Sequence, residues 1–404
     1  MSTLKIGVIR EGKTPPDKRV PLTPEQCRQL AAQYPNVEVF VEKSPIRSFV
    51  DATYEEQGIS VVDDISHCDV LIGVKEVPIP SLIPNKTYFF FSHTIKEQPY
   101  NRQLLQAILE KNIQLVDYEC LTDEKGRRLL GFGRYAGIVG AYNGFLALGK
   151  RLGTFDLKPA HQCEDRVELE EELSKVQLGN RKIVLTGTGR VAHGAVEILQ
   201  KLGIREVKVD EYLKQSFSES VYVRLSVLDY NKRKDGTAGT AQEFFNEPEK
   251  YEANFYRFAQ VSDMFIAGHY WDANAPFLFS REEAGKEDFN IQVVADISCD
   301  IDGPVASTIR PSTIEEPLYG YDPVNEAETT YNAPGAITVM AVDNLPCELP
   351  KDASADFGAE MLRNVLPHLV GADEQNVIAR ASIAKGGQLT EGYQYLTDYV
   401  AGKD

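Results

Sequence analysis

The sequence predicts an α/β protein of two domains, each built around a mostly parallel β-sheet. Two observations predict this class. Short apolar strands alternate with helical segments over residues 1–130, and a second strand–helix–strand unit begins at Lys182 after a long apolar segment. The chain of 404 residues is long enough to form two separate hydrophobic cores.

Composition and charge exclude several classes of function. The 43% of hydrophobic and 25% of charged residues are those of a soluble globular protein, and a net charge of −17 argues against nucleic acid or an anionic membrane as a partner. The six cysteines and six histidines show no metal-binding spacing, so we expect reduced thiols and no metal. We expect the N-terminus to form a strand and a loop and not a targeting leader, and no apolar run approaches the ~20 residues of a membrane span, so we expect a cytoplasmic protein.

The elements of the first domain follow one another in alternation. Thr23 and Pro24 indicate the cap and the first residue of a helix that reaches residue 33. The predicted strands are 4–9, 37–41, 69–74, 87–91 and 113–117, and residues 103–111 form a second helix. Residues 131–153 are then predicted as an apolar helix that leads into the second domain. Its small residues Gly137, Gly140, Ala141 and Gly144 would allow a neighbouring helix or sheet to approach closely.

The second domain is predicted from the segment after Lys182. Residues 183–186 indicate a buried strand, the turn at 187–192 reads G-x-G-x-x-A and leads into a helix, and residues 206–209 indicate a second strand. An acid, Asp210, follows ~20 residues after the turn, which is typical of a Rossmann-like dinucleotide site. The alternative is a glycine-bearing turn that binds nothing.

The turn residues themselves predict how a dinucleotide would bind. Gly187 would permit the tight turn, and Gly189 would let the backbone approach the pyrophosphate. Arg190 and Val191 open the helix, whose first N–H groups favour phosphate. Asp210 would accept hydrogen bonds from ribose hydroxyls.

The rest of the chain is less regular. Residues 211–257 are long and charged and lack a clear period, so we interpret them as a surface insertion. For the wider segment 211–260, rich in aromatic residues, we hypothesise a subunit contact or a cleft lid. Strands are predicted at 264–268, 292–297 and 338–342, a loop at 300–321, and a helix at 353–369 that returns to the first domain.

Several charged residues follow predicted strands, where ligands of parallel sheets lie. They are Lys75, Glu76, His93, Lys96, Glu119 and Asp343, and Arg19 lies in the loop after the first strand. Such a set can bind anions and provide an acid–base pair, as a nicotinamide enzyme that breaks a C–N bond requires. The alternative for each is a solvated surface charge or a structural pair.

At these residues the sequence resembles a known family. The opening IGVIREGK…DKRVPLTPEQ and VKEVP resemble alanine dehydrogenase and transhydrogenase. The segments FFFSHTIKEQ, GFGRYAGIVGAYN, GTGRVAHGA, FIAGHYWDANAPFL and VDNLPCELPKDAS more closely resemble lysine-forming saccharopine dehydrogenase and the lysine-ketoglutarate reductase domain of aminoadipic semialdehyde synthase. The resemblance runs nearly end to end.

The resemblance implies two Rossmann-like domains with the active site in the cleft between them. The substrate domain would comprise residues 1–135 and 335–404, and the dinucleotide domain residues 136–334. The implied reaction interconverts saccharopine with lysine and 2-oxoglutarate through an imine. The second enzyme domain of the bifunctional relatives is expected to be absent.

The resemblance also implies a role for individual residues. Lys75 and His93 would be the acid–base pair, with Glu76 and Glu119 moderating their charge. Arg19, Lys96 and Arg128 would hold substrate carboxylates or set the pKa of the pair. Asp343 would lie near the nicotinamide, and Gly187, Gly189 and Asp210 would bind the dinucleotide.

The sequence leaves the cofactor and the substrate open. Asp210 would repel a 2′-phosphate, so NAD is slightly favoured over NADP, although Lys208 or Lys214 could meet a phosphate. The expected partners are an amino acid and a 2-oxo acid, with a homo-oligomer left open. The alternatives are an alanine-dehydrogenase-like or opine-type enzyme, or a non-catalytic dinucleotide-binding sensor.

Overall fold

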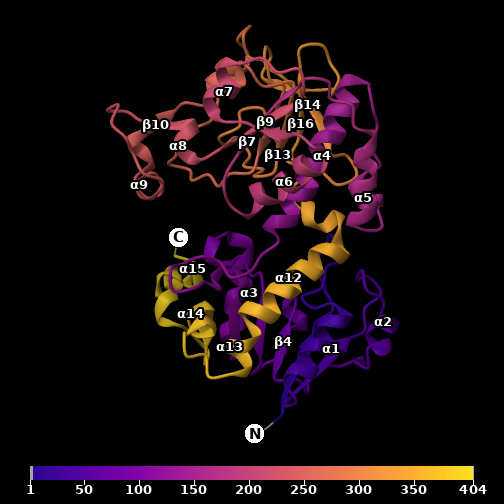
Figure 1. Cartoon of the computed structure of the whole chain (residues 1–404). Helices are drawn as coiled ribbons and strands as arrows, with labels where there is room; N and C mark the ends of the chain where they lie inside the picture. The colour runs from indigo at the N-terminus through magenta and orange to yellow at the C-terminus, as the bar shows by residue number, and fades with distance from the viewer. Residues whose placement is uncertain (1–2, 404) are drawn as a thin grey trace. The chain divides into compact units, whose positions relative to one another are not determined.

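The computed structural model describes residues 3–403, which form two compact α/β units. The first unit comprises Met1–Phe132 and Pro350–Asp404, and the second comprises Gly133–Leu349. Each unit has its own eight-stranded, mostly parallel sheet (Figure 1), which confirms the predicted fold class. The predicted return to the first domain at residue 335 is wrong, because residues Ile337–Met340 still form a strand of the second sheet.

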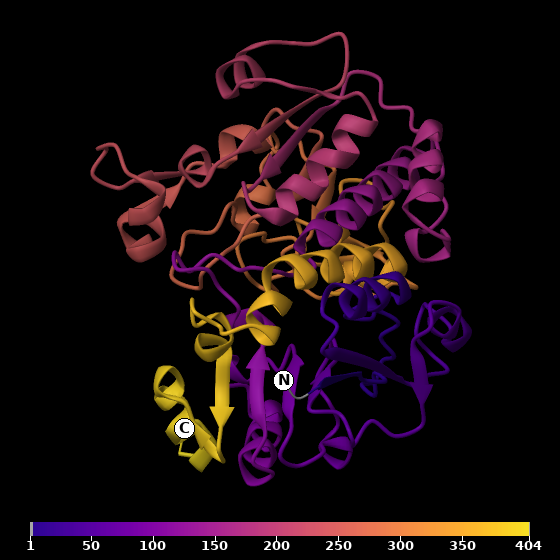
Figure 2. The same ribbon diagram turned by 60° about the horizontal axis from the view of Figure 1, so that its bottom comes forward.

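The sheet of the first unit has six parallel strands and two antiparallel strands at one edge. In sheet order the strands are β18 (Gln388–Leu389), β17 (Ser382–Lys385), β6 (Gln114–Asp117), β5 (Thr87–Phe90), β4 (Val70–Ile72), β1 (Leu4–Val8), β2 (Val37–Glu42) and β3 (Ser60–Val62). Figure 2 shows the yellow C-terminal strand β17 beside the magenta strands and running opposite to them. The last part of the chain therefore completes the sheet that the first part begins.

Helices cover this sheet and bury two hydrophobic clusters. The helices are α1 (Pro24–Gln33), α2 (Asp51–Glu56), α3 (Pro99–Glu110), α12 (Pro350–Asn364), α13 (Leu366–Val370), α14 (Val377–Ala381) and α15 (Thr397–Ala401). Ile72 and Phe89 belong to one cluster, whereas Leu71 and Phe90 belong to the other. Because successive strand residues point to opposite faces, each face of the sheet has its own core.

The second unit contains a sheet with six parallel strands and an antiparallel pair at one edge. In sheet order the strands are β15 (Ala327–Thr329), β14 (Leu318–Asp322), β16 (Ile337–Met340), β13 (Val293–Asp296), β12 (Met264–Ala267), β7 (Lys182–Thr186), β9 (Val221–Leu225) and β8 (Arg205–Glu206). The antiparallel pair β14–β15 was missed, because its start lies in the segment predicted as a loop. In this sheet β7 lies between β9 and β12. After β7 the chain forms β8 and β9 on one side of it and then crosses to form β12 on the other side, so the strand order reverses between β7 and β12.

Helices of the second unit pack on both sides of this sheet. They are α4 (Gly133–Leu152), α5 (Arg166–Glu172), α6 (Arg190–Lys201), α7 (Val209–Lys214), α8 (Val227–Tyr230), α9 (Ala241–Asn246), α10 (Tyr256–Ala259) and α11 (Arg281–Ala284). The glycines of α4 allow close contact as predicted. A Cβ on Gly144 would lie 2.8 Å from the Cβ of Ala295 in β13, and one on Gly137 would overlap the Val191 carbonyl of α6.

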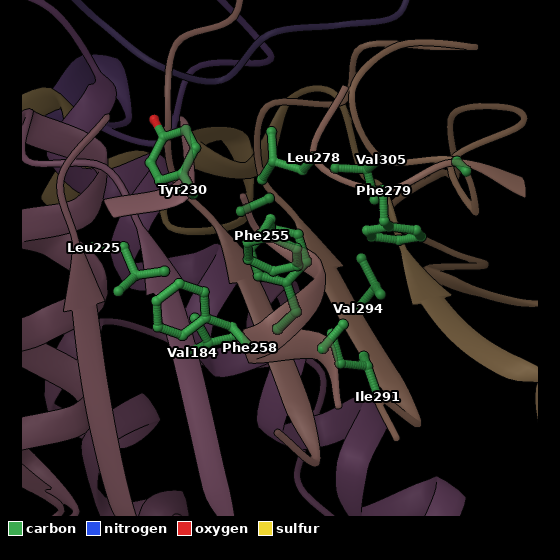
Figure 3. Packing of buried hydrophobic residues seen from close by; sticks show 14 of the residues in the cluster. Val184, Leu225, Tyr230, Phe255, Phe258, Leu278, Phe279, Ile291, Val294 and Val305 are labelled. Carbon is green, nitrogen blue, oxygen red and sulfur yellow. The ribbon is translucent and has the colours of Figure 1, made fainter. Parts of the chain in front are cut away.

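The segment predicted as a surface insertion contains part of the core. It contributes β9, which pairs directly with β7, before the chain extends outward in α8, α9 and the hairpin of β10 (Asn231–Arg233) and β11 (Tyr251–Ala253) (Figure 1). Figure 3 shows Phe255 and Phe258 near Val184, Leu225 and Val294 in the hydrophobic core. The interpretation of this segment as a simple surface insertion is therefore wrong.

No helix among residues 3–403 combines the length and the apolar character that crossing a bilayer requires.

Candidate functional site

The first unit brings His93 and Glu76 together at the ends of two neighbouring strands. Glu76 follows β4 and His93 follows β5, and these strands are parallel partners. The Nδ1 atom of His93 lies 2.6 Å from Glu76 Oε1, and Lys13 Nζ lies 2.6 Å from Glu76 Oε2. The sequence predicted the first two residues but missed Lys13, whose only signal was its place in the charged loop after the first strand.

This arrangement keeps Glu76 ionised and orients His93. Burial raises the pKa of Glu76, but hydrogen bonds from His93 and Lys13 outweigh it and lower the pKa to about 2. The Glu76 bond holds Nδ1 of the partly exposed His93 ring, so Nε2 remains the atom for proton exchange. His93 also has a left-handed backbone, with φ of 54°, which is uncommon outside glycine and occurs at strained functional positions.

Lys75 is positioned through its backbone by a second buried acid. Glu11 accepts hydrogen bonds from the backbone N–H groups of Val74, at 2.6 Å, and Lys75, at 2.9 Å. Burial raises the pKa of Glu11 to about 7, although these two bonds and Arg19 lower it. The sequence offered no signal that Glu11 turns inward, because acids in charged loops are usually solvated.

Arg19 is buried and already paired. Its Nε atom lies 3.0 Å from Asp17 Oδ1, one terminal nitrogen lies 2.6 Å from Asp17 Oδ2, and its guanidinium lies 4.2 Å from the centre of the Phe132 ring. Burial raises the pKa of Asp17, but the charge and the hydrogen bonds of Arg19 together outweigh it and lower the pKa to about 2. Asp17 therefore balances much of the positive charge of Arg19, which was expected to hold substrate carboxylates or to set the pKa of the acid–base pair.

Lys96, Arg128 and Glu119 form a second charged group near the end of β6. Lys96 Nζ lies 3.6 Å and an Arg128 nitrogen 3.2 Å from Glu119 Oε1. The Glu119 side chain is 9% exposed, whereas the side chains of Lys96 and Arg128 are 48% and 56% exposed. The buried acid thus holds two cations at the surface, where they can bind carboxylates.

The second unit places the glycine turn at the reversal of strand order between β7 and β12. Gly187 has φ of 106°, and a Cβ there would lie 3.1 Å from the Cα atom of His269. Gly189 precedes α6, and a Cβ added to it would meet nothing within 4 Å. Arg190 is the first residue of α6 and Val191 the next. The turn thus leaves space beside Gly189, directly before the N-terminus of α6. Space next to a helix N-terminus suits a bound diphosphate.

Asp210 does not occupy its predicted position. It lies in the first turn of α7, with its side chain 84% exposed and paired with Lys214, and the short edge strand β8 precedes it. The strand beside β7 is β9, which is followed by Ser226. The prediction of a strand over residues 206–209 that ends at Asp210 is therefore wrong, because α7 already begins at Val209 and a later segment forms the strand beside β7. The predicted contact of Asp210 with a ribose stays a prediction.

Two further groups lie at the carboxyl edge of the second sheet. Asp343 is exposed beyond the end of β16, and its place near the nicotinamide stays a prediction. His269, which sequence reasoning missed, follows β12 and is only 7% exposed. Its Nδ1 atom lies 2.7 Å from Thr186 Oγ1, and its Nε2 atom has no hydrogen-bond partner among residues 3–403. The open turn, the helix N-terminus and this unpartnered atom fit a bound dinucleotide.

Comparisons with known proteins confirm the predicted resemblance. Residues 7–139 match the family described as alanine dehydrogenase/PNT, N-terminal domain. The aminoadipic semialdehyde synthases of Arabidopsis thaliana and Bos taurus are 29% and 30% identical over 97% of this chain, but the matches cover 41% and 47% of those proteins. This chain thus spans less than half their length.

A relative of similar length and a solved structure complete the comparison. The saccharopine dehydrogenase [NAD(+), L-lysine-forming] of Yarrowia lipolytica is 27% identical, with 89% of this chain and 90% of that protein covered. The structure of an L-alanine dehydrogenase has a TM-score of 0.66 at 18% identity, with 98% of this chain and 100% of that chain covered. This structural likeness shows a shared fold.

Proposed function

We propose that the chain is an oxidoreductase that interconverts saccharopine with lysine and 2-oxoglutarate, using a nicotinamide dinucleotide. One observation carries the proposal: Glu76 holds His93 at the end of β5, and Lys75 follows the neighbouring strand β4. The similarity to a lysine-forming saccharopine dehydrogenase over nine-tenths of that protein supports the choice of substrate.

Lys75 and His93 would move the protons of this reaction. In the oxidative direction the pair takes the proton of the secondary amine as the C–N bond becomes an imine. It then assists the attack of water on the imine and returns a proton to the lysine nitrogen as the carbinolamine collapses. Glu76 fixes the His93 ring and stays ionised, so it stabilises the imidazolium formed when His93 accepts a proton.

The remaining predicted residues would bind the reactants. Lys96 and Arg128 suit the carboxylates of saccharopine, because both are half exposed and share one buried acid. Arg19 would hold a substrate carboxylate less strongly than Lys96 or Arg128, because Asp17 already balances much of its charge. Gly187, Gly189, Arg190 and Val191 would hold the dinucleotide, which supplies the hydride acceptor when bound. We accordingly assign substrate and proton transfer to the first unit and the dinucleotide to the second.

Both cofactors remain candidates. The preference for NAD depended on Asp210, which lies on α7 and not at the end of β9. That end carries Ser226, whose hydroxyl donates to Asp229 at 2.6 Å within the next turn. Asp229 thus places a carboxylate beside this strand end, although Ser226 already donates two hydrogen bonds to it, so the choice between NAD and NADP stays open.

An absorbance assay at 340 nm tests the proposal. We expect lysine and 2-oxoglutarate together to oxidise NADH or NADPH, with little oxidation when either substrate is omitted. Lys75→Met and His93→Gln should each lower kcat by about 100-fold or more, because each removes a proton carrier. His67→Gln, at an exposed histidine, should leave kcat unchanged.

The same assay separates the other candidate functions. Oxidation with ammonia and pyruvate, but not with lysine and 2-oxoglutarate, would favour the alanine-dehydrogenase-like enzyme. Oxidation with another amino acid and 2-oxo acid would favour an opine-type enzyme. Dinucleotide binding without any turnover would favour a sensor.

A further inference from the structure

His269 is a buried side chain in which one ring nitrogen is hydrogen-bonded and the other has no hydrogen-bond partner among residues 3–403. The side chain lies next to β7, because Nδ1 is 2.7 Å from the hydroxyl oxygen of Thr186, the last residue of that strand. Nε2 is buried and has no protein partner among residues 3–403. Buried nitrogens are nearly always hydrogen-bonded, so an unpartnered one indicates a missing partner.

The position of His269 points to the ligand that provides this partner. It follows β12, whereas Gly187 follows β7, and these are the two strands between which the strand order reverses. Ligands of open α/β sheets bind at this point. The Tyr230 ring, from the segment after β9, lies 5.9 Å from the His269 ring. His269 therefore lies between the segments that follow β7, β9 and β12.

This placement selects one half of a dinucleotide. In the Rossmann arrangement the adenosine ribose lies near the end of the strand that neighbours the first one, which is β9 here. Burial lowers the pKa of His269 to about 4, so the ring is neutral near pH 7 and suits a neutral hydroxyl better than a phosphate. The carboxylate expected at this end, Asp210, lies elsewhere.

We propose that Nε2 of His269 hydrogen-bonds a ribose hydroxyl in the adenosine half of the bound dinucleotide, while Thr186 holds Nδ1 and sets the ring orientation. The proposal depends on the proposed function only in requiring that a dinucleotide binds to the second unit. It makes His269 the group that recognises the ribose in place of the strand-end acid.

Binding affinity measured without turnover tests this assignment. We would titrate the whole chain with ADP by calorimetry and with NADH and NADPH by fluorescence, for the unsubstituted protein and for His269→Leu. Loss of one neutral hydrogen bond should raise the Kd of all three ligands by about 3- to 10-fold. His67→Leu, at an exposed histidine outside the second unit, should leave each Kd unchanged.

Two amide substitutions separate a ligand contact from a structural role. The Gln side chain can place an amide near the position of Nε2, whereas Asn can replace only Nδ1 and its bond to Thr186. We expect His269→Gln to bind ADP more tightly than His269→Asn. Because both keep a polar group, they also provide the comparison if His269→Leu does not fold.

Four outcomes would overturn the proposal. Tighter binding by His269→Asn than by His269→Gln would show that His269 only supports Thr186. An unchanged Kd in His269→Leu would show that Nε2 has another partner, and weakened NADH binding with unchanged ADP binding would place it at the nicotinamide half. If the unsubstituted protein bound none of the three ligands, the dinucleotide part of the proposed function would fail as well.

Discussion

Glu76, Asp17 and Glu11 are three carboxylates of the first unit that lose much of their contact with water, and their pKa values diverge. Burial raises the pKa of each, but Glu76 meets His93 and Lys13, and Asp17 meets Arg19, so both pKa values fall to about 2. Glu11 accepts mainly from neutral backbone amides, so its pKa rises to about 7. At the scale of single residues, the hydrogen-bond partners of a buried carboxylate therefore decide whether it is ionised near neutral pH.

Glu11 should make stability depend on pH. Between its usual pKa of 4.5 and about 7, the folded chain keeps a proton that the unfolded chain has lost, so stability falls as pH rises through this window. The full effect is about 3 kcal/mol by linkage. Because Glu11→Gln cannot ionise, its stability should not show this decrease with pH. Urea unfolding at pH 4.5 and pH 8 would measure the free energy of unfolding of both proteins.

The exposed Glu38→Gln provides the control, because that side chain points to water from β2. Its stability should follow the unsubstituted protein across the pH range. Parallel pH curves for Glu11→Gln and the unsubstituted protein would contradict the inward, protonated Glu11.

At the scale of elements, α4 and α6 depend on glycines that face each other. A Cβ on Gly137 would overlap the carbonyl of Val191, and one on Gly194 would overlap the carbonyl of Arg134. Each helix thus presses its backbone against the other. Because α6 begins with the residues of the glycine turn, the packing of α4 also fixes the helix end that would meet the phosphates.

Gly137→Ala should therefore disturb both stability and binding. Overpacking against backbone, which cannot rotate away, should destabilise the second unit by about 3 kcal/mol and weaken NADH binding. Thermal unfolding and a fluorescence titration would measure the two effects. Gly392→Ala is the matched control, because a Cβ there meets nothing within 4 Å. Equal stability of the two variants would argue against tight α4–α6 packing.

At the scale of the whole molecule, the groups assigned to the proposed reaction are divided between the two units. The first carries the proposed acid–base residues and the surface cations, and the second carries the glycine turn.

Dinucleotide binding should protect the backbone amides around its site from hydrogen exchange. NADH at 100 times its Kd stabilises the bound state by about 2.7 kcal/mol, so amide exchange should slow around residues 186–194 and 266–270. Strand β2 of the first unit serves as the internal reference. Protection confined to other parts of the second unit would contradict the site at the β7–β12 reversal.

The sequence by itself determined the features that depend on neighbouring residues. Apolar alternation and the Thr23–Pro24 cap located the first helix and about half of the strands, and the small residues of α4 correctly indicated close packing. The pairing of Glu76 with His93 was also foreseeable, because parallel strands bring their carboxyl ends to one edge.

Only the tertiary structure decided which distant segments pair. Asp210 satisfied the expected spacing, but β9 from a later segment takes the place beside β7 and moves the acid to an exposed helix. Glu11 and His269 gave no sequence signal, and Lys13 gave only its place in a charged loop, since a charged loop and a strand end look the same whether their side chains turn inward or outward. Strand order and burial arise from the packing of the whole unit, which local periodicity does not encode.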